Sequence, residues 1–216
     1  MIKLVIFDMD GVLVDSEKVT AKASKDALAK WGVNASLTDF IEYAGMGDDK
    51  FVGCVAEKYG VKYDVEMKEE MYRIYCERSK TDVFVYDWSK PIIETLGKKY
   101  TLALASAADL PKVKANIDCI GVDTSVFKAL ITGSDVEKKK PDPTIFLKAA
   151  EKAGIAPENA VVFEDAVSGV MAAKAAGMTA IAVTTTFDEE TLKKAGADFV
   201  VDNLSDSVKI IEELNK

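Results

Sequence analysis

Two aspartates, Asp8 and Asp10, stand one residue apart near the start of the chain, after an apolar run and before Gly11. The run at residues 1–7 has the character of an interior strand, and open α/β sheets bind ligands at the carboxyl ends of such strands. Two carboxylates held there repel each other unless a cation lies between them, and Mg²⁺ accepts carboxylate and carbonyl oxygens. For this segment alone, the alternative is an ordinary strand followed by an Asp–Gly turn.

Polar groups of complementary kinds also follow three other predicted strands. Because the carboxyl ends of parallel strands meet at one edge of a sheet, we expect these groups to surround the same point as the two aspartates. Carboxylates would hold a cation there, while a lysine, a hydroxyl and backbone amides would neutralise phosphate oxygens. The sequence therefore predicts a site for a metal ion and a phosphate group. The groups are Ser106, Ala107, Lys140, Glu164 and Asp165.

The chain has no histidine, which excludes every mechanism that needs imidazole as a base, a relay or a metal ligand. A nucleophile must therefore come from the carboxylates and hydroxyls at the strand ends. Asp8 is the best placed, since a carboxylate can form an acyl phosphate that water later splits. Asp10 could then serve as the acid for the leaving oxygen and as the base for that water.

Alternating strand and helix patterns position these groups. From about residue 88 onward, strand-like runs alternate with helical segments, which is typical of a parallel sheet covered on both faces. Residues 16–83 have helical periodicity alone. We expect a doubly wound, Rossmann-like α/β core at residues 1–15 and 84–216, with a small helical cap domain at 16–83 inserted after the first strand. The later strands are expected at residues 101–106, 129–132, 160–164, 179–183 and 198–201.

Composition narrows the classes of partner. The chain has 216 residues, 49% of them apolar, and a net charge of −8 from 28 basic and 36 acidic residues. An acidic protein of this kind argues against nucleic acid or an anionic membrane as the main partner. No apolar run is long enough to span a bilayer. Cys54, Cys76 and Cys119 are scattered, as expected for reduced thiols in a cytoplasmic protein.

Four short motifs in this chain resemble those of the haloacid dehalogenase-like superfamily, in the same order and each at a predicted strand end. The helical block after the first motif resembles the small cap of the superfamily's β-phosphoglucomutase-like phosphatase branch. The resemblance covers essentially the whole chain, and the four motifs together are highly specific. They are Asp8-Met9-Asp10-Gly11-Val12, Ser106, Lys140-Pro141-Asp142-Pro143 and Glu164-Asp165.

The resemblance implies roles for the residues at the strand ends. Asp8 would be the nucleophile and Asp10 the general acid and base. Ser106, Ala107 and Lys140 would bind the phosphoryl group that is transferred. The second aspartate, at position 10, argues for phosphoryl transfer rather than dehalogenation within this superfamily. Lys140 precedes a proline and is held extended, so its ammonium group is expected to point inward.

The resemblance also implies a Mg²⁺ cofactor. The metal would be held by the side chain of Asp8, the backbone carbonyl of Asp10 and the side chain of Asp165. Glu164 would bind the metal directly or support the residues that do. For Glu164 and Asp165, the alternative is an acidic pair that stabilises a helix N-terminus.

The cap is expected to choose the substrate. Residues 43–50 resemble the specificity loop of the branch, where β-phosphoglucomutase has an arginine that grips the second phosphate of a sugar bisphosphate. This chain has Asp48 near that place, and Thr20 near the place of a histidine on the first cap helix. These departures favour hydrolysis, because an acidic loop repels a second phosphate. The cationic candidates for contacting the substrate are Lys50 and Arg73.

We therefore expect a Mg²⁺-dependent phosphatase that hydrolyses a small phosphorylated metabolite, such as a sugar phosphate, through an aspartyl phosphate. One alternative is a β-phosphoglucomutase-like mutase. Another is a phosphoryl-accepting signalling domain of the receiver kind, which also clusters aspartates, Mg²⁺ and a lysine at strand ends. The inserted cap argues against a receiver, because a receiver needs an open face for its partners.

Overall fold

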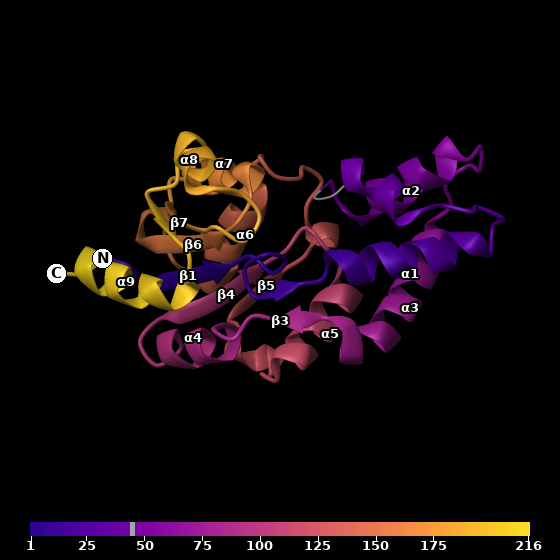
Figure 1. Ribbon diagram of the computed structural model, residues 1–216. Helices are drawn as coiled ribbons and strands as arrows, with labels where there is room; N and C mark the ends of the chain where they lie inside the picture. The colour runs from indigo at the N-terminus through magenta and orange to yellow at the C-terminus, as the bar shows by residue number, and fades with distance from the viewer. Residues whose placement is uncertain (44–45) are drawn as a thin grey trace.

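A six-stranded parallel sheet forms the centre of the protein (Figure 1). The computed structural model describes residues 1–43 and 46–216. Strand β1 (Leu4–Phe7) lies between β4 (Thr101–Ala105) and β6 (Ala160–Glu164), and all neighbouring strands are parallel. The order across the sheet is β5-β4-β1-β6-β7-β8, which confirms the predicted doubly wound α/β fold. The remaining strands are β5 (Ala129–Ile131), β7 (Thr179–Val183) and β8 (Phe199–Val201).

Strand β1 shows why the sheet is stable and why its end is well placed. All four of its side chains are fully buried: Val5 and Phe7 join the apolar cluster on one face, Leu4 and Ile6 that on the other. Complete burial of each such side chain is worth about 1.5–3 kcal/mol. The strand is also hydrogen-bonded on both edges, so Asp8, which follows it, has little freedom to move.

Helices cover both faces of the sheet, as Figure 1 shows. Apolar side chains of α4, α5 and α9 pack on the face that carries Phe7, and those of α6, α7 and α8 pack on the face that carries Ile6. These helices are α4 (Ser89–Leu96), α5 (Leu110–Ile120), α6 (Thr144–Ala153), α7 (Val167–Ala175), α8 (Glu189–Lys194) and α9 (Ser207–Leu214).

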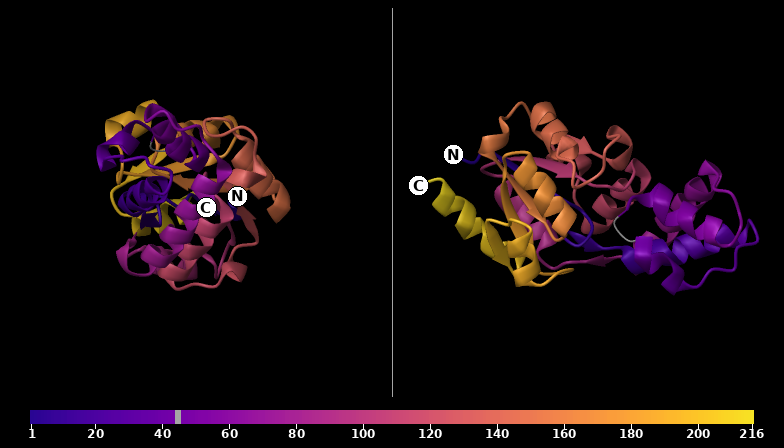
Figure 2. Two further views of the ribbon diagram at one scale, coloured as in Figure 1. Left: turned by 90° about the vertical axis from the view of Figure 1, so that its right-hand side faces the viewer. Right: turned by 90° about the horizontal axis from the view of Figure 1, so that it is seen from above.

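Among the described residues, three α-helices and the short 3-10 helix Leu37–Tyr43 form a separate block, which we call the cap (residues 16–83), while the rest of the chain is the core. The α-helices are α1 (Glu17–Ala29), α2 (Asp48–Lys58) and α3 (Val65–Asp82). The block has its own cluster of buried apolar side chains and extends beyond one end of the sheet, away from both termini (Figures 1 and 2). The separate cluster supports the predicted division, although the domain bounds stay a prediction. Among the described residues, no helix is long and apolar enough to cross a membrane.

The two crossings between core and cap contain structure that the sequence analysis missed. Strands β2 (Val14–Asp15) and β3 (Phe84–Val85) pair in an antiparallel manner and tie the crossings together. Each has two residues, which is too short for apolar alternation to be recognised. Three predicted strands were also one residue too long, because the chain leaves the sheet before Ser106 and before Thr132 and enters it only after Asp198.

Candidate active site

Side chains from three strand ends meet at the edge of the sheet that faces the cap. Asp8 follows β1, Glu164 ends β6, and Lys140 lies in the loop after β5. The Lys140 ammonium group donates to Asp8 Oδ1 at 2.5 Å and also to Glu164 Oε1. Its side chain is 10% exposed, and its nitrogen lies 4.8 Å from the centre of the Phe146 ring. The expected inward direction of Lys140 agrees with this geometry, and its bond to Pro141 is cis.

Burial and charge shift the protonation of these groups. Burial raises the pKa of Asp8 to about 7; the Lys140 charge opposes this increase, and the charges of Glu164 and Asp10 add to it. Burial likewise raises the pKa of Asp165, and the charges of Glu164 and Asp8 add to this. Burial alone would lower the pKa of Lys140, but Asp8 and Glu164 outweigh it and raise that pKa. The edge thus holds more negative charge than Lys140 neutralises, which is a setting that suits a further cation.

Two glycines allow the backbone to approach the acidic side chains. Gly11 has a φ of +80°, and a Cβ atom there would lie 2.0 Å from Asp165 Oδ2. Gly169, at the start of α7, leaves the space that the Glu164 carboxylate occupies, since a Cβ atom would lie 1.8 Å from Glu164 Oε1. Any other residue at either position would displace a carboxylate. The first motif and the Glu164-Asp165 motif are therefore coupled through close packing as well as charge.

Fewer acidic side chains are available to hold Mg²⁺ than the sequence analysis allowed. Both Glu164 oxygens are engaged, one by Lys140 and the other by the N–H groups of Asp165 and Ala166 at 3.0 Å each. Among the described residues, no three acidic side chains converge on one point. The carboxylates of Asp8 and Asp165 and the carbonyl of Asp10, which the resemblance implies as ligands, stay a prediction. Glu164 fits better as a support for Lys140 than as a ligand.

The loop after β4 lies beside this cluster. Ser106 is buried, and its hydroxyl oxygen accepts a hydrogen bond from the N–H of Ala108 at 3.1 Å. The hydroxyl hydrogen is then free to point toward an oxygen of a bound phosphoryl group. Ala107, the next residue, lines the cavity between core and cap. The roles of both residues in phosphate binding stay predictions.

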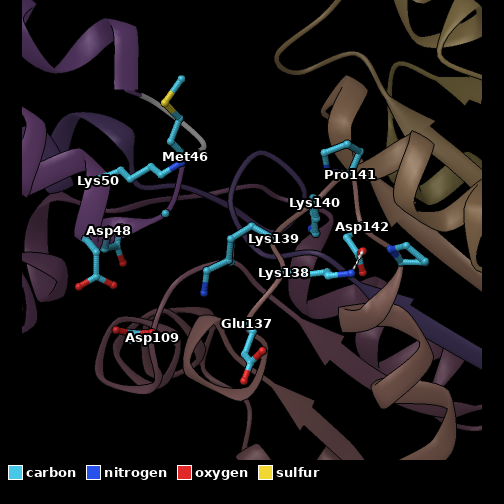
Figure 3. A pocket seen from close by; sticks show the side chains of 14 residues that line it. Met46, Asp48, Lys50, Asp109, Glu137, Lys138, Lys139, Lys140, Pro141 and Asp142 are labelled. Carbon is cyan, nitrogen blue, oxygen red and sulfur yellow. Dashed lines mark ion pairs between the residues drawn. The ribbon is translucent and has the colours of Figure 1, made fainter.

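A cavity of about 870 Å³ separates the core edge from the cap. Figure 3 shows Met46 and Lys50 on its cap side and Lys139 and Lys140 on its core side. Lys50 was expected to face the substrate, and it lines the cavity. Its lining residues are Met46, Gly47, Asp48, Asp49 and Lys50 from the cap, and Ala107, Asp109, Glu137, Lys138, Lys139, Lys140, Pro141, Asp142 and Pro143 from the core.

The expectation for Arg73 is wrong. Arg73 is 54% exposed and pairs with Glu70 and Glu77 on the outer side of α3. Lys68 and Tyr72 lie on the face of this helix that contacts Asp49 and Asp48 of α2, and Arg73 lies about 100° around the helix from Tyr72. A helix presents residues to one face every three or four positions, so position 73 could not share the face of 68 and 72.

The two acidic residues of the predicted specificity loop, Asp48 and Asp49, have polar partners that the sequence did not reveal. Asp48 and Asp49 form the first turn of α2 rather than a loop; Ala44 and Gly45 of the predicted specificity loop lie outside the described residues. Tyr72 donates to Asp48 Oδ2 at 2.8 Å. Lys68 lies 2.8 Å from Asp49 Oδ1 and 2.9 Å from Asp109 Oδ2 of the core. Thr20, compared above with a histidine position, is buried, and its hydroxyl donates to the Ser16 carbonyl at 2.9 Å.

Three polar contacts at the site were not predicted. Ser16 donates its hydroxyl hydrogen to Asp10 Oδ1, and Thr186 donates to Asp165 Oδ2. Lys112, on α5, lies 3.2 Å from Asp10 Oδ2. A signal for Lys112 exists in the sequence: Lys112 and Asn116 are polar residues four positions apart on the buried face of an otherwise apolar helix stripe.

Known proteins resemble this chain over most of its length. A family model described as haloacid dehalogenase-like hydrolase matches residues 5–183. Over 201 residues the chain is 30% identical to a phosphorylated carbohydrates phosphatase of Thermotoga maritima, covering 89% of the chain and 91% of that protein. Over 208 residues it is 37% identical to SUPPRESSOR OF QUENCHING 1, a chloroplastic protein of Arabidopsis thaliana. That match covers 94% of the chain but 20% of the longer plant protein.

A solved structure also shares the whole fold. The β-phosphoglucomutase of Clostridium difficile superposes with a TM-score of 0.81 at 24% identity, covering 99% of this chain and 96% of that one. At this identity the likeness concerns the fold, including the cap. The family match and the relatives confirm the resemblance identified from the motifs. The chain therefore belongs to the haloacid dehalogenase-like hydrolase family and is a phosphoric monoester hydrolase.

Proposed function

We propose that this protein is a Mg²⁺-dependent phosphatase that hydrolyses a small phosphorylated carbohydrate through a phosphorylated Asp8. The observation that carries the proposal is the buried lysine that bridges Asp8 and Glu164 where two neighbouring strands end. The named activity of the Thermotoga maritima relative, a phosphatase of phosphorylated carbohydrates, supports the substrate class. The cavity of about 870 Å³ offers room for such a substrate.

In the proposed reaction, a carboxylate oxygen of Asp8 attacks the phosphorus and the bond to the leaving oxygen breaks. Asp10 donates a proton to that oxygen, so the sugar leaves as a neutral alcohol. Asp10 then accepts a proton from a water molecule that attacks the phosphorus of phospho-Asp8. This second step releases inorganic phosphate and restores Asp8.

The groups around Asp8 support charge development in both steps. Lys140 is held beside Asp8 by a hydrogen bond of 2.5 Å, so it can neutralise the oxygens of the transferring phosphoryl group without moving far. The hydroxyl of Ser106 and the N–H of Ala107 are proposed to bind the same oxygens. Mg²⁺, held by Asp8, Asp165 and the Asp10 carbonyl, would supply a positive charge that draws the phosphoryl group toward Asp8.

The test is turnover of phosphate esters by the purified protein. p-Nitrophenyl phosphate, glucose 6-phosphate, fructose 1-phosphate and glycerol 3-phosphate should be compared by kcat/KM, with Mg²⁺ and with excess EDTA. We expect hydrolysis that EDTA abolishes and that added Mg²⁺ restores. Absence of turnover of every ester with Mg²⁺ would contradict the proposed function, and full activity in EDTA would contradict the metal.

The acidic first turn of α2 supports hydrolysis over isomerisation. A mutase must hold a bisphosphate by its distal phosphate and keep water away from phospho-Asp8. Here Asp48 faces the cavity, and Lys68 is already shared by Asp49 and Asp109. With β-glucose 1-phosphate and a trace of the 1,6-bisphosphate, we expect free phosphate without glucose 6-phosphate. Rapid formation of glucose 6-phosphate with little free phosphate would favour the mutase.

A further inference from the structure

The buried position of Lys112 is not explained by a contribution to the stability of the fold. It lies in the first turn of α5, and its side chain is 7% exposed. A buried charge costs several kcal/mol unless it is well paired, and a cation is unfavourable near a helix N-terminus. Apart from Lys112 and Asn116, the buried face of α5 is apolar, with Val113, Ile117 and Ile120 on it. A lysine here therefore calls for a functional reason.

The partners of Lys112 come from both the core and the cap. Its ammonium nitrogen lies 3.2 Å from Asp10 Oδ2 in the core and 5.7 Å from the centre of the Tyr75 ring in the cap. Tyr75 in turn donates to Asn116 Oδ1 at 2.5 Å, one turn further along α5. Burial would lower the pKa of Lys112, but Asp10 and then Asp48 raise it above the ordinary value, so the side chain is cationic.

Each oxygen of the Asp10 carboxylate therefore has a polar partner. Ser16, the residue just before the first cap helix, donates to Oδ1, while Lys112 lies beside Oδ2. The side chain of Asp10 is 28% exposed, so it can rotate toward solvent if its contact with Ser16 or Lys112 is lost. Proton transfer needs the donor within about 2.6–3.2 Å of its target, and a misplacement of about 1 Å can cost about 10²-fold in rate.

We propose that Lys112 is a positioning residue that fixes Asp10 for proton transfer while the cap is docked on α5. The inference rests on the proposed function, because it assigns Asp10 the proton transfer to the leaving oxygen. It extends that function to a residue outside the four motifs. Lys112 does not touch the phosphoryl group in this arrangement; it acts through Asp10.

The dependence of kcat/KM on the leaving group distinguishes this positioning role of Lys112 from a purely structural role. p-Nitrophenolate leaves without a proton, whereas the alkoxide of a sugar needs one. In Lys112→Met, kcat/KM for the alkyl ester that the wild type hydrolyses fastest should fall about 10²-fold. The value for p-nitrophenyl phosphate should change by less than about threefold, since formation of phospho-Asp8 from this ester does not use the proton of Asp10.

Two further variants complete the comparison. Lys114→Met removes an exposed lysine from the same helix and should behave as the wild type with both esters. Lys112→Arg keeps the charge and the donors and should recover at least about tenfold of the lost alkyl-ester activity. Thermal unfolding of each variant checks folding, and Lys112→Gln supplies the same comparison if Lys112→Met does not fold.

Three outcomes would overturn the inference. The first is an equal fall for both esters, which indicates general damage to the site. The second is a Lys112→Met variant that matches Lys114→Met. The third is recovery of alkyl-ester activity when Asp48→Asn is added to Lys112→Met, since Lys112 would then merely balance a cap carboxylate. By contrast, a wild-type protein that hydrolyses none of the esters would overturn the proposed function itself.

Discussion

The core and the cap, which lie on either side of the cavity, hold their polar side chains in place by different means. On the core side, Asp8 and Glu164 follow or end strands of one parallel sheet, and Lys140 bridges them. On the cap side, Asp48 lies on α2 and is bonded by Tyr72 of α3. The sheet fixes the core groups through backbone hydrogen bonds, whereas the cap groups depend on how helices pack. We therefore expect substitutions on the core side to stop the chemistry and those on the cap side to change substrate affinity.

Replacement of the nucleophile gives the sharpest form of this contrast. Asp8→Asn preserves the shape of the side chain but removes the charge that attacks phosphorus, so kcat should fall at least about 10⁴-fold. Asp118→Asn, on the exposed side of α5, makes the same chemical change outside the site and should leave kcat unchanged. Substantial turnover by Asp8→Asn would show that another group forms the intermediate.

Loss of the bridging lysine should have the next largest effect. Lys140→Met leaves Asp8 and Glu164 without their shared cation, so kcat should fall about 10²–10³-fold, as for loss of one preorganised electrostatic group. Removal of one partner of a buried pair should also destabilise the fold by about 3 kcal/mol. Activity assays and urea unfolding measure the two effects.

The matched control is Lys138→Met, two residues earlier in the same loop. The Lys138 side chain is 78% exposed, and its nearest acidic oxygen, on Asp142, lies 3.9 Å away. Such a contact contributes little to stability. Equal losses in Lys138→Met and Lys140→Met would mean that the loop requires positive charge in general, and the specific bridge would lose its support.

The core side was accessible to sequence analysis for a physical reason. A central parallel strand is buried on both faces, so it appears as an uninterrupted apolar run, and the residue after it must lie at the sheet edge. Asp8 and Glu164 could be placed together in this way although they are 156 positions apart. Lys140 followed because the proline after it restricts the backbone.

The cap side was less accessible because it depends on contacts between helices. Sequence periodicity indicated which residues of α3 are apolar, but not how α3 lies against α2 and α5. The direction of Arg73 was therefore misjudged, and the pairing of Lys68 with Asp49 and Asp109 was missed. The contact of Lys112 with Asp10 depends on where the first turn of α5 begins, which is set by packing at the edge of the sheet.

Added metal should stabilise the core side selectively. In the metal-free protein the pKa of Asp8 is about 7, above the ordinary value of 3.8. Between these values the folded state binds a proton more tightly than the unfolded chain does, so this group's contribution to stability decreases as pH rises toward 7. Mg²⁺ at about 100 times its Kd should restore about 2.7 kcal/mol. Thermal unfolding should show a larger increase in Tm from Mg²⁺ at pH 8 than at pH 5.5.

Two variants assign that stabilisation to one side of the cavity. Asp165→Asn removes a proposed ligand and should largely abolish the increase in Tm. Asp49→Asn removes a cap carboxylate that already pairs with Lys68 and should keep it. An undiminished increase in Asp165→Asn would place the metal elsewhere in the protein.

Lys68 offers the smallest and most discriminating change, because it joins the cap to the core. It lies within 2.9 Å of Asp109, the residue before α5, and within 2.8 Å of Asp49 on α2. Lys68→Met should raise KM several-fold while kcat changes less than about threefold, and unfolding stability should fall by about 1 kcal/mol, near the upper end for partly exposed pairs. Arg73→Met, on the outer side of α3, loses its pairs with Glu70 and Glu77 and should leave KM unchanged. If instead Lys68→Met lowers kcat as strongly as Lys140→Met does, the cap side takes part in the chemical step, and the contrast between the two sides of the cavity fails.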